Sequence, residues 1–285
     1  MKLTTKQKLD IVRLYKTNKY NIASLSRETG YYSKTISNIL DEYNIDRSKS
    51  QRNRKTKYTF NKDIFNNINN EQKAYWLGFL LGDGSISHNN LRIELSEKDK
   101  GHIAKFKKFM ESDNPIKPSR KNCYTFNINN TNFVESLSRF GLVQNKTYLN
   151  VTTPYSYIPK RLLTHFYRGL FDADGWISVS NGHKRQNGTY AKRYDIGFSS
   201  YNDSILYEIQ SFYNNHLQKK HGYIIKRQKP GKTKTQQTCQ LIYGGRNLFI
   251  NLGDLIYKNS STYLDRKYEL YQQCKTDILS KKYDL

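Results

Sequence analysis

Two segments of the chain carry an Asp-Gly pair at the same place in a similar pattern. The first runs from Tyr75 to Ser87 and the second from Phe166 to Ser178. Both segments contain a glycine, three further residues, a small residue and then Asp-Gly. One residue after Asp-Gly, both continue with Ile-Ser. The two aspartates, Asp83 and Asp174, are 91 positions apart (174 − 83), which leaves room for one small αβ unit per copy.

The spacing of small residues predicts that these two carboxylates meet. In each copy two small residues lie four apart, on one face of an expected helix: Gly78 and Gly82, Gly169 and Ala173. Such faces let two helix backbones pack closely, so Asp83 and Asp174 would emerge together at the helix C-termini. Helix dipoles and like charge make that place unfavourable for two carboxylates unless a cation binds. Hard oxygen ligands suit Mg²⁺, which can activate water at a phosphate. A single Asp-Gly is more simply a helix stop, but the matched pair favours a metal site.

Alternating apolar and polar residues predict strands after each motif. They run through Leu91–Leu95 and Tyr124–Ile128 in the first copy, and through Ile196–Phe198 and Gln240–Tyr243 in the second. Helical patterns separate them, at 103–110 and 205–217. Each copy is therefore predicted as helix, hairpin, helix, hairpin, helix, with one sheet face left polar for a ligand.

These repeats resemble the LAGLIDADG homing endonucleases, whose nine motif positions are occupied by Trp76–Gly84 and Tyr167–Gly175. Further likeness lies at Ile158–Lys160 and Tyr263–Tyr268. The resemblance implies an α+β fold in which two pseudo-symmetric αββαββα units, residues 63–150 and 151–285, form a saddle-like DNA-binding surface. It also implies a site-specific endonuclease that hydrolyses phosphodiester bonds in both strands of duplex DNA.

The resemblance assigns the catalytic metal to Asp83 and Asp174, with Gly82 and Ala173 beside them, and the expected cofactor is Mg²⁺, for which Mn²⁺ would substitute. Asp172 is set apart as structural, because its counterpart in the first copy is Leu81.

The resemblance also implies one lysine near each active site. Lys146 is the candidate in the first copy; in the second, Lys258 is preferred and Lys267 is the alternative. Glu94 and Gly197 are assigned to the strand position of a water-organising polar residue. Glycine cannot serve there, so the two strand cuts could be unequal.

The polar strand faces are expected to contact bases in the major groove, with solvated surface as the alternative for each residue. The candidates are Arg92, Glu94, Thr125 and Asn127 in the first copy, and Arg193, Asp195, Ser199 and Gln240 in the second. Lys184 and Arg185 are expected at a hairpin tip that lengthens the DNA footprint.

Residues 1–46 resemble a helix-turn-helix domain that follows a first helix. Ser26 is the small residue between the helices, Gly30 forms the turn, and Ser33 is expected to cap the second helix. Base contacts would come from the exposed residues of that helix: Lys34, Thr35, Ser37 and Asn38. An ordinary three-helix cap is the alternative interpretation.

Residues 47–62 form a basic stretch whose Arg52 and Arg54 could follow the phosphate backbone, unless it is only a solvated linker. The net charge of +24 favours a nucleic-acid partner, although an AT-rich genome would also enrich lysine. Three scattered cysteines indicate neither a zinc knuckle nor disulfides.

No apolar run is long enough to cross a membrane, and no secretory signal is evident. We therefore expect a cytoplasmic, free-standing enzyme, encoded by a prokaryote or phage, with an organelle as the alternative. The resemblance, with both copies in one chain, implies a monomer encoded by a mobile genetic element that binds a long, non-palindromic DNA target. Two alternatives stay open: an intron RNA maturase and a catalytically silent DNA-binding regulator.

Overall fold

The structure is a computed structural model that describes residues 3–17, 20–45, 58–146, 149, 152–184, 188, 190–218, 221–228 and 237–280. The chain divides into two compact units, Met1–Lys57 and Tyr58–Leu285. Arg52, Arg54 and Arg185 lie outside the described residues. None of the helices in the described part combines the length and the apolar character that a membrane span requires.

The first unit consists of three helices, α1 (Thr5–Lys16), α2 (Ile22–Thr29) and α3 (Ser33–Glu42). Their apolar faces meet in a small core of its own that contains Leu25, Ile36 and Leu40. Gly30 ends α2 with φ +73°, a left-handed conformation that glycine adopts without strain. The predicted cap is wrong: Tyr32 is the N-cap residue of α3, and no side chain caps this helix.

The second unit begins within the segment that was predicted as a linker up to residue 62. The Asn61 amide donates to the Met110 carbonyl at 2.9 Å, and Phe60 packs edge-on against Phe133, with ring centroids 5.1 Å apart. These contacts place residues 58–62 on the body of the second unit.

Each copy of the repeat forms the predicted succession of elements. The first comprises α4 (Glu71–Asp83), β1 (Gly84–Ser87), β2 (Asn90–Ser96), α5 (Lys100–Phe109), β3 (Lys117–Pro118), β4 (Cys123–Asn129) and α6 (Thr131–Leu137). The second comprises α7 (Leu163–Asp174), β5 (Gly175–Lys184), β6 (Tyr190–Ser200), α8 (Asp203–Leu217), β7 (Tyr223–Gln228), β8 (Gln237–Gly244) and α9 (Arg246–Tyr257). A further helix, α10 (Asp265–Ser280), follows. The predicted α+β class and the two-unit architecture are confirmed.

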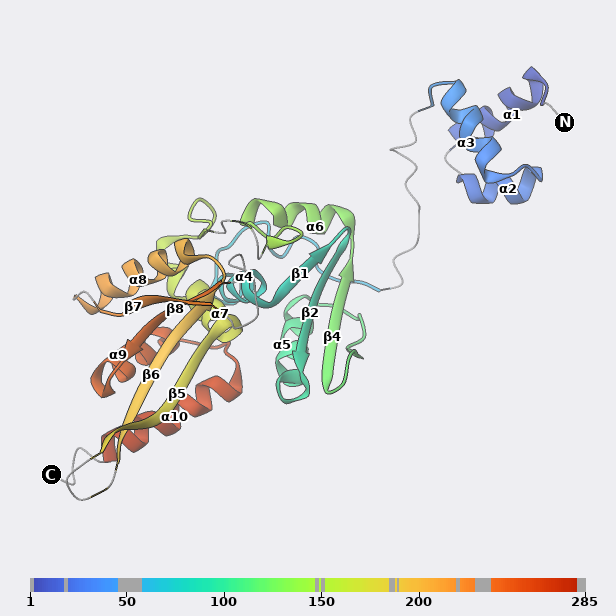
Figure 1. Cartoon of the computed structure of the whole chain (residues 1–285). Coiled ribbons are helices and arrows are strands. Elements are labelled where there is room, and N and C mark those ends of the chain that lie inside the picture. The colour runs from blue at the N-terminus through green and yellow to red at the C-terminus, as the bar shows by residue number, and fades with distance from the viewer. Residues whose placement is uncertain are drawn as a thin grey trace. The chain divides into compact units, whose positions relative to one another are not determined.

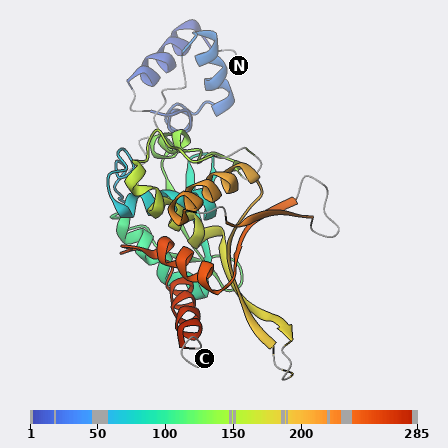
Figure 2. The ribbon, with the colours of Figure 1, turned by 90° about the vertical axis from the view of Figure 1, so that its left-hand side faces the viewer.

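The strands form two antiparallel four-stranded sheets with the equivalent orders β1-β2-β4-β3 and β5-β6-β8-β7. In Figure 1 the sheets lie on either side of α4 and α7. The ribbon of β5 and β6 extends well beyond the helices (yellow in Figure 2). In β2 every second side chain is buried, as at Leu91 and Ile93, so that the residues between them face outward.

Helices α4 and α7 pack with their backbones in contact. A Cβ atom on Gly78 would lie 2.0 Å from the carbonyl oxygen of Phe166, and one on Gly169 would lie 2.0 Å from that of Tyr75. A Cβ on Gly82 would lie 2.4 Å from the Cβ of Ala173. No side chain larger than the observed ones fits at these crossings, which confirms the packing that the small-residue spacing predicted. One continuous apolar core joins both copies around this pair.

Candidate active site

The C-terminal ends of α4 and α7 bring Asp83 and Asp174 together. A Cβ on Gly82 would lie 3.0 Å from Asp174 Oδ2, so this carboxylate reaches across to the other motif helix. Asp83 is half-buried; Asp174 keeps an exposed surface, although its carboxyl group lies among many protein atoms. Burial, and then the charge of Asp174, raise the pKa of Asp83 to about 7. Burial also raises the pKa of Asp174. The two carboxylates therefore lie close together at the ends of the two motif helices.

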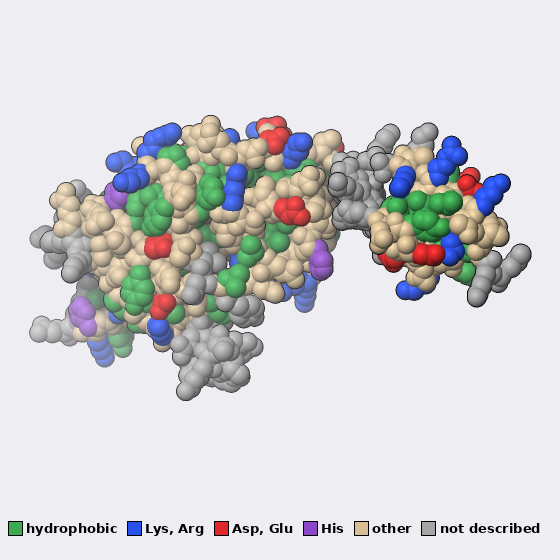
Figure 3. All heavy atoms as spheres, turned by 90° about the horizontal axis from the view of Figure 1, so that it is seen from above, with side chains coloured by type: hydrophobic (Ala, Val, Ile, Leu, Met, Phe, Trp, Pro, Cys, Tyr) green, Lys and Arg blue, Asp and Glu red, His purple; other side chains and the backbone are tan. Residues whose placement is uncertain are grey.

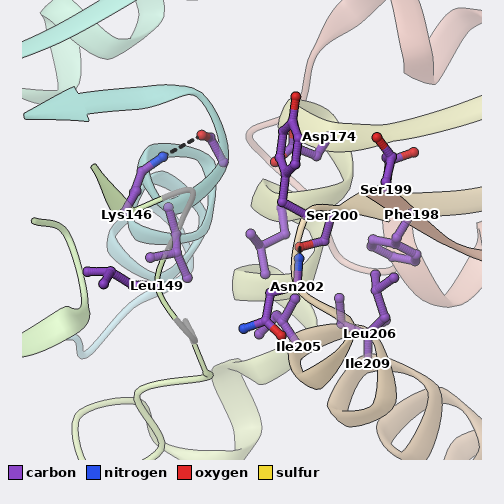
Figure 4. A pocket seen from close by; sticks show the side chains of 15 residues that line it. Lys146, Leu149, Asp174, Phe198, Ser199, Ser200, Asn202, Ile205, Leu206 and Ile209 are labelled. Carbon is purple, nitrogen blue, oxygen red and sulfur yellow. Dashed lines mark hydrogen bonds between the residues drawn. The ribbon is translucent and has the colours of Figure 1, made fainter. Parts of the chain in front are cut away.

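A lysine lies at the end of each motif helix. Lys146 Nζ donates to the Gly82 carbonyl at 2.7 Å (Figure 4). Lys267, on α10, is buried, and its Nζ donates to the carbonyls of Phe171 and Asp172 at 2.7 and 2.8 Å and to that of Gly175. Both lysines thus bind carbonyls that a helix C-terminus leaves without partners. Burial lowers the pKa of each lysine, while the two motif aspartates oppose this shift.

The second-copy lysine at the site is Lys267, the alternative, and not Lys258. Lys258 is exposed at the end of α9, and none of the described contacts joins it to Asp83 or Asp174. Lys267 reaches the site because α10 is anchored across both copies. Within this segment, Arg266 pairs with Asp99 of the first copy at 3.0 Å.

The donor set at the helix ends fits a divalent cation of the Mg²⁺ type. Two carboxylates meet there, and the backbone carbonyls of Gly82 and Ala173 lie next to them. Among the described residues no group of three or more His, Cys, Asp or Glu side chains is suited to a metal. Mg²⁺ needs only one or two carboxylates, since water and substrate phosphate complete its shell. Burial, and then the charge of Asp174, raise the pKa of Asp83, and the charges of Lys267 and Lys146 oppose this shift without cancelling it.

Asp172 has a structural role, as predicted. It is buried and accepts hydrogen bonds from Tyr75 at 2.8 Å, the Leu264 amide at 2.7 Å and Tyr257 at 3.3 Å. These donors come from α4, α9 and the segment before α10. Asp172 therefore ties three parts of the second unit together, away from the pair of motif aspartates.

An open polar pocket of about 560 Å³ adjoins Asp83. It is lined by Asp83, Ser85, Arg92, Glu94, Ser119 and Arg120. Glu94 is bound by Arg92 and accepts from Arg120 Nε at 2.5 Å and from Ser119 Oγ at 2.5 Å. The Ser119 hydroxyl, followed by the two guanidinium groups, lowers the pKa of Glu94. This side of the site holds a fixed carboxylate between two cations.

The pocket beside Asp174 is smaller and mostly apolar, with a volume of about 180 Å³. Figure 4 shows Lys146 and Leu149 on one side of it, and Asp174, the end of β6 and α8 on the other. Leucine, isoleucine and phenylalanine side chains form most of its wall, with Ser199, Ser200 and Asn202 at the end of β6. The surroundings of the two aspartates are thus chemically different.

The strand register corrects the predicted equivalence of Glu94 and Gly197. Gly84 pairs with Ile93 in the first sheet, and Gly175 pairs with Phe198 in the second. Glu94 directly follows Ile93, so its counterpart is Ser199, directly after Phe198. Gly197 instead matches Arg92. The error arose because the β5–β6 hairpin is longer: Ser199 lies 24 residues after Gly175 (199 − 175), whereas Glu94 lies 10 after Gly84 (94 − 84).

The predicted DNA-contacting strand residues share the outer faces of the two sheets. Arg92 pairs with Asn127 and Glu94 with Thr125. Ser199 pairs with Gln240, while Arg193 and Asp195 lie on the same face of β6. Thr125 is buried and donates to the Ile93 carbonyl at 3.1 Å, whereas Lys184, at the end of β5, is exposed.

On α3 of the first unit, Lys34 and Asn38 are exposed, while Thr35 and Ser37 are half-buried. On the face of the molecule drawn in Figure 3, Lys and Arg side chains are spread over the surface, whereas Asp and Glu side chains form small separate groups.

Three residues around Asp83 escaped the sequence analysis: Ser85, Ser119 and Arg120. Ser85 follows the motif by one residue and faces outward on β1, so the alternation of that strand could have identified it. Ser119 and Arg120 belong to the turn between β3 and β4, and their approach to Glu94 depends on the pairing of β2 with β4.

Solved structures share this fold, although no protein-family profile and no curated protein matches the sequence. The I-LtrWI LAGLIDADG homing endonuclease bound to target DNA is 14% identical, with a TM-score of 0.51, over 75% of this chain and 92% of that one. The LAGLIDADG meganuclease I-AabMI bound to uncleaved DNA is 13% identical, with a TM-score of 0.53, over 76% and 92%. I-SmaMI bound to an uncleaved DNA target in the presence of calcium ions is 10% identical, with a TM-score of 0.50, over 76% and 92%.

Over about 75% of its length the chain therefore has the fold of the LAGLIDADG homing endonucleases. The resemblance inferred from the two motifs is confirmed at the level of the fold.

Proposed function

We propose that this protein is a site-specific DNA endonuclease that hydrolyses a phosphodiester bond in each strand of a duplex target. The observation that carries the proposal is the meeting of Asp83 and Asp174 at the ends of paired helices, between two sheets with polar outer faces. Two acids in this position raise the free energy of the folded protein, and binding alone would not require them. The similar solved structures are bound to DNA, which supports the same partner here.

Asp83 and Asp174 would hold a divalent cation, with Gly82 and Ala173 adjacent; when bound, it supplies a Lewis acid for the phosphate and lowers the pKa of water. Mg²⁺ is the expected ion, with Mn²⁺ as a substitute. In the reaction a water oxygen bonds to phosphorus, and the bond from phosphorus to one bridging oxygen breaks. The water loses a proton to solvent, and the leaving oxygen takes one up. Lys146 and Lys267 donate to carbonyls at the ends of the two motif helices, next to the aspartates, and there they would stabilise the extra negative charge of the transition state.

One chain supplies both halves of the site, so a monomer can cut both strands of a target that is not palindromic. The outer sheet faces carry Arg92 and Asn127 in one copy and Arg193 and Gln240 in the other. These side-chain types form hydrogen bonds with base edges in the major groove.

The test uses duplex DNA from an allele that lacks this gene and spans its insertion point. The protein is incubated with Mg²⁺, Mn²⁺, Ca²⁺ or EDTA, and the ends are sequenced. We expect one discrete double-strand cut that depends on Mg²⁺ or Mn²⁺ and is lost in Asp83→Asn and Asp174→Asn. Binding without a cut under every metal condition would overturn the endonuclease and favour a regulator. Tight, Mg²⁺-independent binding to structured intron RNA would favour a maturase.

We also propose that the first unit binds DNA beside the cleavage site through α3. The unit has the helix–turn–helix succession, with Gly30 in the turn and exposed Lys34 and Asn38 on α3. The Lys34→Ala/Asn38→Ala variant should bind the full target at least about tenfold more weakly, since a lost bidentate base contact is worth about 1–3 kcal/mol. Lys16→Ala removes the same charge from α1 and serves as the control. Equal losses in both variants would show a general charge effect and contradict the role of α3.

A further inference from the structure

The outer face of the first sheet carries a row of polar side chains that crosses three neighbouring strands. Ser85 on β1 pairs with Arg92 on β2, and Arg92 pairs with Asn127 on β4. All three residue types form hydrogen bonds with the edges of bases. We call these three residues the polar row.

The equivalent row of the second sheet is apolar. Its four members, which we call the apolar row, pair in succession across β5, β6, β8 and β7: Trp176 with Gly197, Gly197 with Ile242, and Ile242 with Tyr223. Because both rows start one residue after the motif glycine, Trp176 takes the place that Ser85 has in the first sheet. The two rows therefore occupy equivalent places in the two sheets and differ in their chemistry.

The indole of Trp176 lies over Gly197. A Cβ on this glycine would lie 2.8 Å from Cζ2 and 3.0 Å from Cε2 of the ring, so a larger residue does not fit beneath the indole. The indole Nε1 is buried and has no acceptor among the described residues. In this position the ring offers a ligand only its carbon atoms.

The apolar row stays partly open to solvent. Trp176 is half-buried, and 48% of the Tyr223 surface is exposed. Between them, Ile242 is only 5% exposed, although it points to the outer face as Gln240 does. Neighbouring side chains therefore cover Ile242 and form a continuous apolar surface with it. An open apolar surface bordered by polar residues is typical of a binding site.

Thymine is the base that suits such a surface. Its 5-methyl group is the apolar group that base edges present in the major groove, where the other groups are hydrogen-bond donors and acceptors. A polar base edge against the apolar row would lose water without gaining a hydrogen bond, which costs free energy. A methyl group against the same carbon atoms gains free energy from its burial.

We propose that the apolar row recognises thymine methyl groups in the half of the target bound by the second copy, while the polar row reads hydrogen-bonding base edges in the other half. Trp176 and Tyr223 are then specificity-determining residues. The row spans three strand spacings of about 4.8 Å, so these thymines lie within a run of about four base pairs, which are about 3.4 Å apart. The inference rests on the proposed endonuclease function, which supplies duplex DNA as the substrate.

The test removes one methyl group of the DNA at a time. Each thymine of the mapped target is replaced by deoxyuridine, which keeps the base pair, and the affinity of the full chain is measured in EDTA by fluorescence anisotropy. We expect each replacement within the run to weaken binding about fourfold, which corresponds to about 0.8 kcal/mol for one buried methyl group. Losses spread equally over both halves, or no thymine in the run, would overturn the inference while the endonuclease stands. The absence of DNA binding would overturn both.

Two variants assign the loss to the apolar row. Trp176→Ser introduces the residue of the first copy, and Tyr223→Ser removes a side chain that lies outside the core. In each variant the loss caused by deoxyuridine should fall below about twofold, because the methyl group has lost its partner. Tyr207→Ser removes a tyrosine of similar exposure from α8 and is the matched control, which should keep the full loss. A full loss that persists in both row variants would overturn the inference.

Discussion

Replacement of Asp83 by Asn should make the metal-free protein more stable while it abolishes cleavage. Burial, and then the neighbouring Asp174, raise the pKa of Asp83 from 3.8 to about 7. The folded protein therefore keeps a proton on Asp83 at pH values where the unfolded chain has lost it. Stability from this group is fully present below pH 3.8 and is lost as the pH rises towards 7.

The size of the effect follows from this shift. Each pKa unit corresponds to about 1.4 kcal/mol, so ionised Asp83 destabilises the fold by about 4 kcal/mol above pH 7. Water still reaches part of this half-buried side chain. Solvent screening therefore makes about 4 kcal/mol an upper limit for the destabilisation. Asn has nearly the same shape and no charge. The stability advantage of Asp83→Asn should therefore grow between pH 5 and pH 8, by at most about 2.6 kcal/mol.

The assay is urea unfolding in EDTA at pH 5, 6, 7 and 8, followed by tryptophan fluorescence. Trp76 and Trp176 are the two tryptophans of the chain, and both lie in the second unit, so the signal reports on the unit that contains the site. Asp63→Asn, on the exposed surface, is the control and should change stability by less than about 0.5 kcal/mol at every pH. An Asp83→Asn advantage that is absent at pH 8, or that is the same at all four pH values, would refute the reasoning.

Three further substitutions, two of them with a matched control, test the framework around the site by urea unfolding at pH 7. Gly169→Ala should destabilise the folded protein by more than about 3 kcal/mol, since its Cβ would lie 2.0 Å from a carbonyl oxygen of α4. Its control, Gly101→Ala on α5, has open space around the added Cβ and should be neutral or stabilise the protein by up to about 1 kcal/mol. Lys267→Met should destabilise the folded protein by about 3 kcal/mol and slow cleavage. Its control, Lys258→Met at an exposed position, should change stability by less than about 0.5 kcal/mol. Larger effects in Lys258→Met than in Lys267→Met would restore Lys258 as the lysine of the second copy. Arg168→Met breaks an ion pair whose guanidinium is fully buried and should destabilise by about 3–5 kcal/mol, and a change below about 1 kcal/mol would show that the pair is dispensable.

Local pattern in the sequence was sufficient to predict the repeated fold and the acid pair. Small residues four apart predicted the close packing of α4 and α7, and the Asp-Gly that follows each run placed Asp83 and Asp174 at the helix ends. Alternation of apolar and polar residues predicted which strand face is free, because side chains alternate across a strand. These features depend on near neighbours along the chain, and each of them occurs in both copies of the repeat.

Tertiary structure decided the surroundings of the acids. The partner of Glu94 in the second copy is Ser199 and not Gly197, because register depends on hairpin length and cross-strand pairing, which alternation does not specify. Lys267 lies 93 positions after Asp174 (267 − 174), and only the anchoring of α10 across both copies brings it to the carbonyls of α7. In a sequence with 48 basic residues, the local pattern does not distinguish this lysine from the others. What distinguishes it is burial against an unsatisfied helix end, which exists only once the chain has folded.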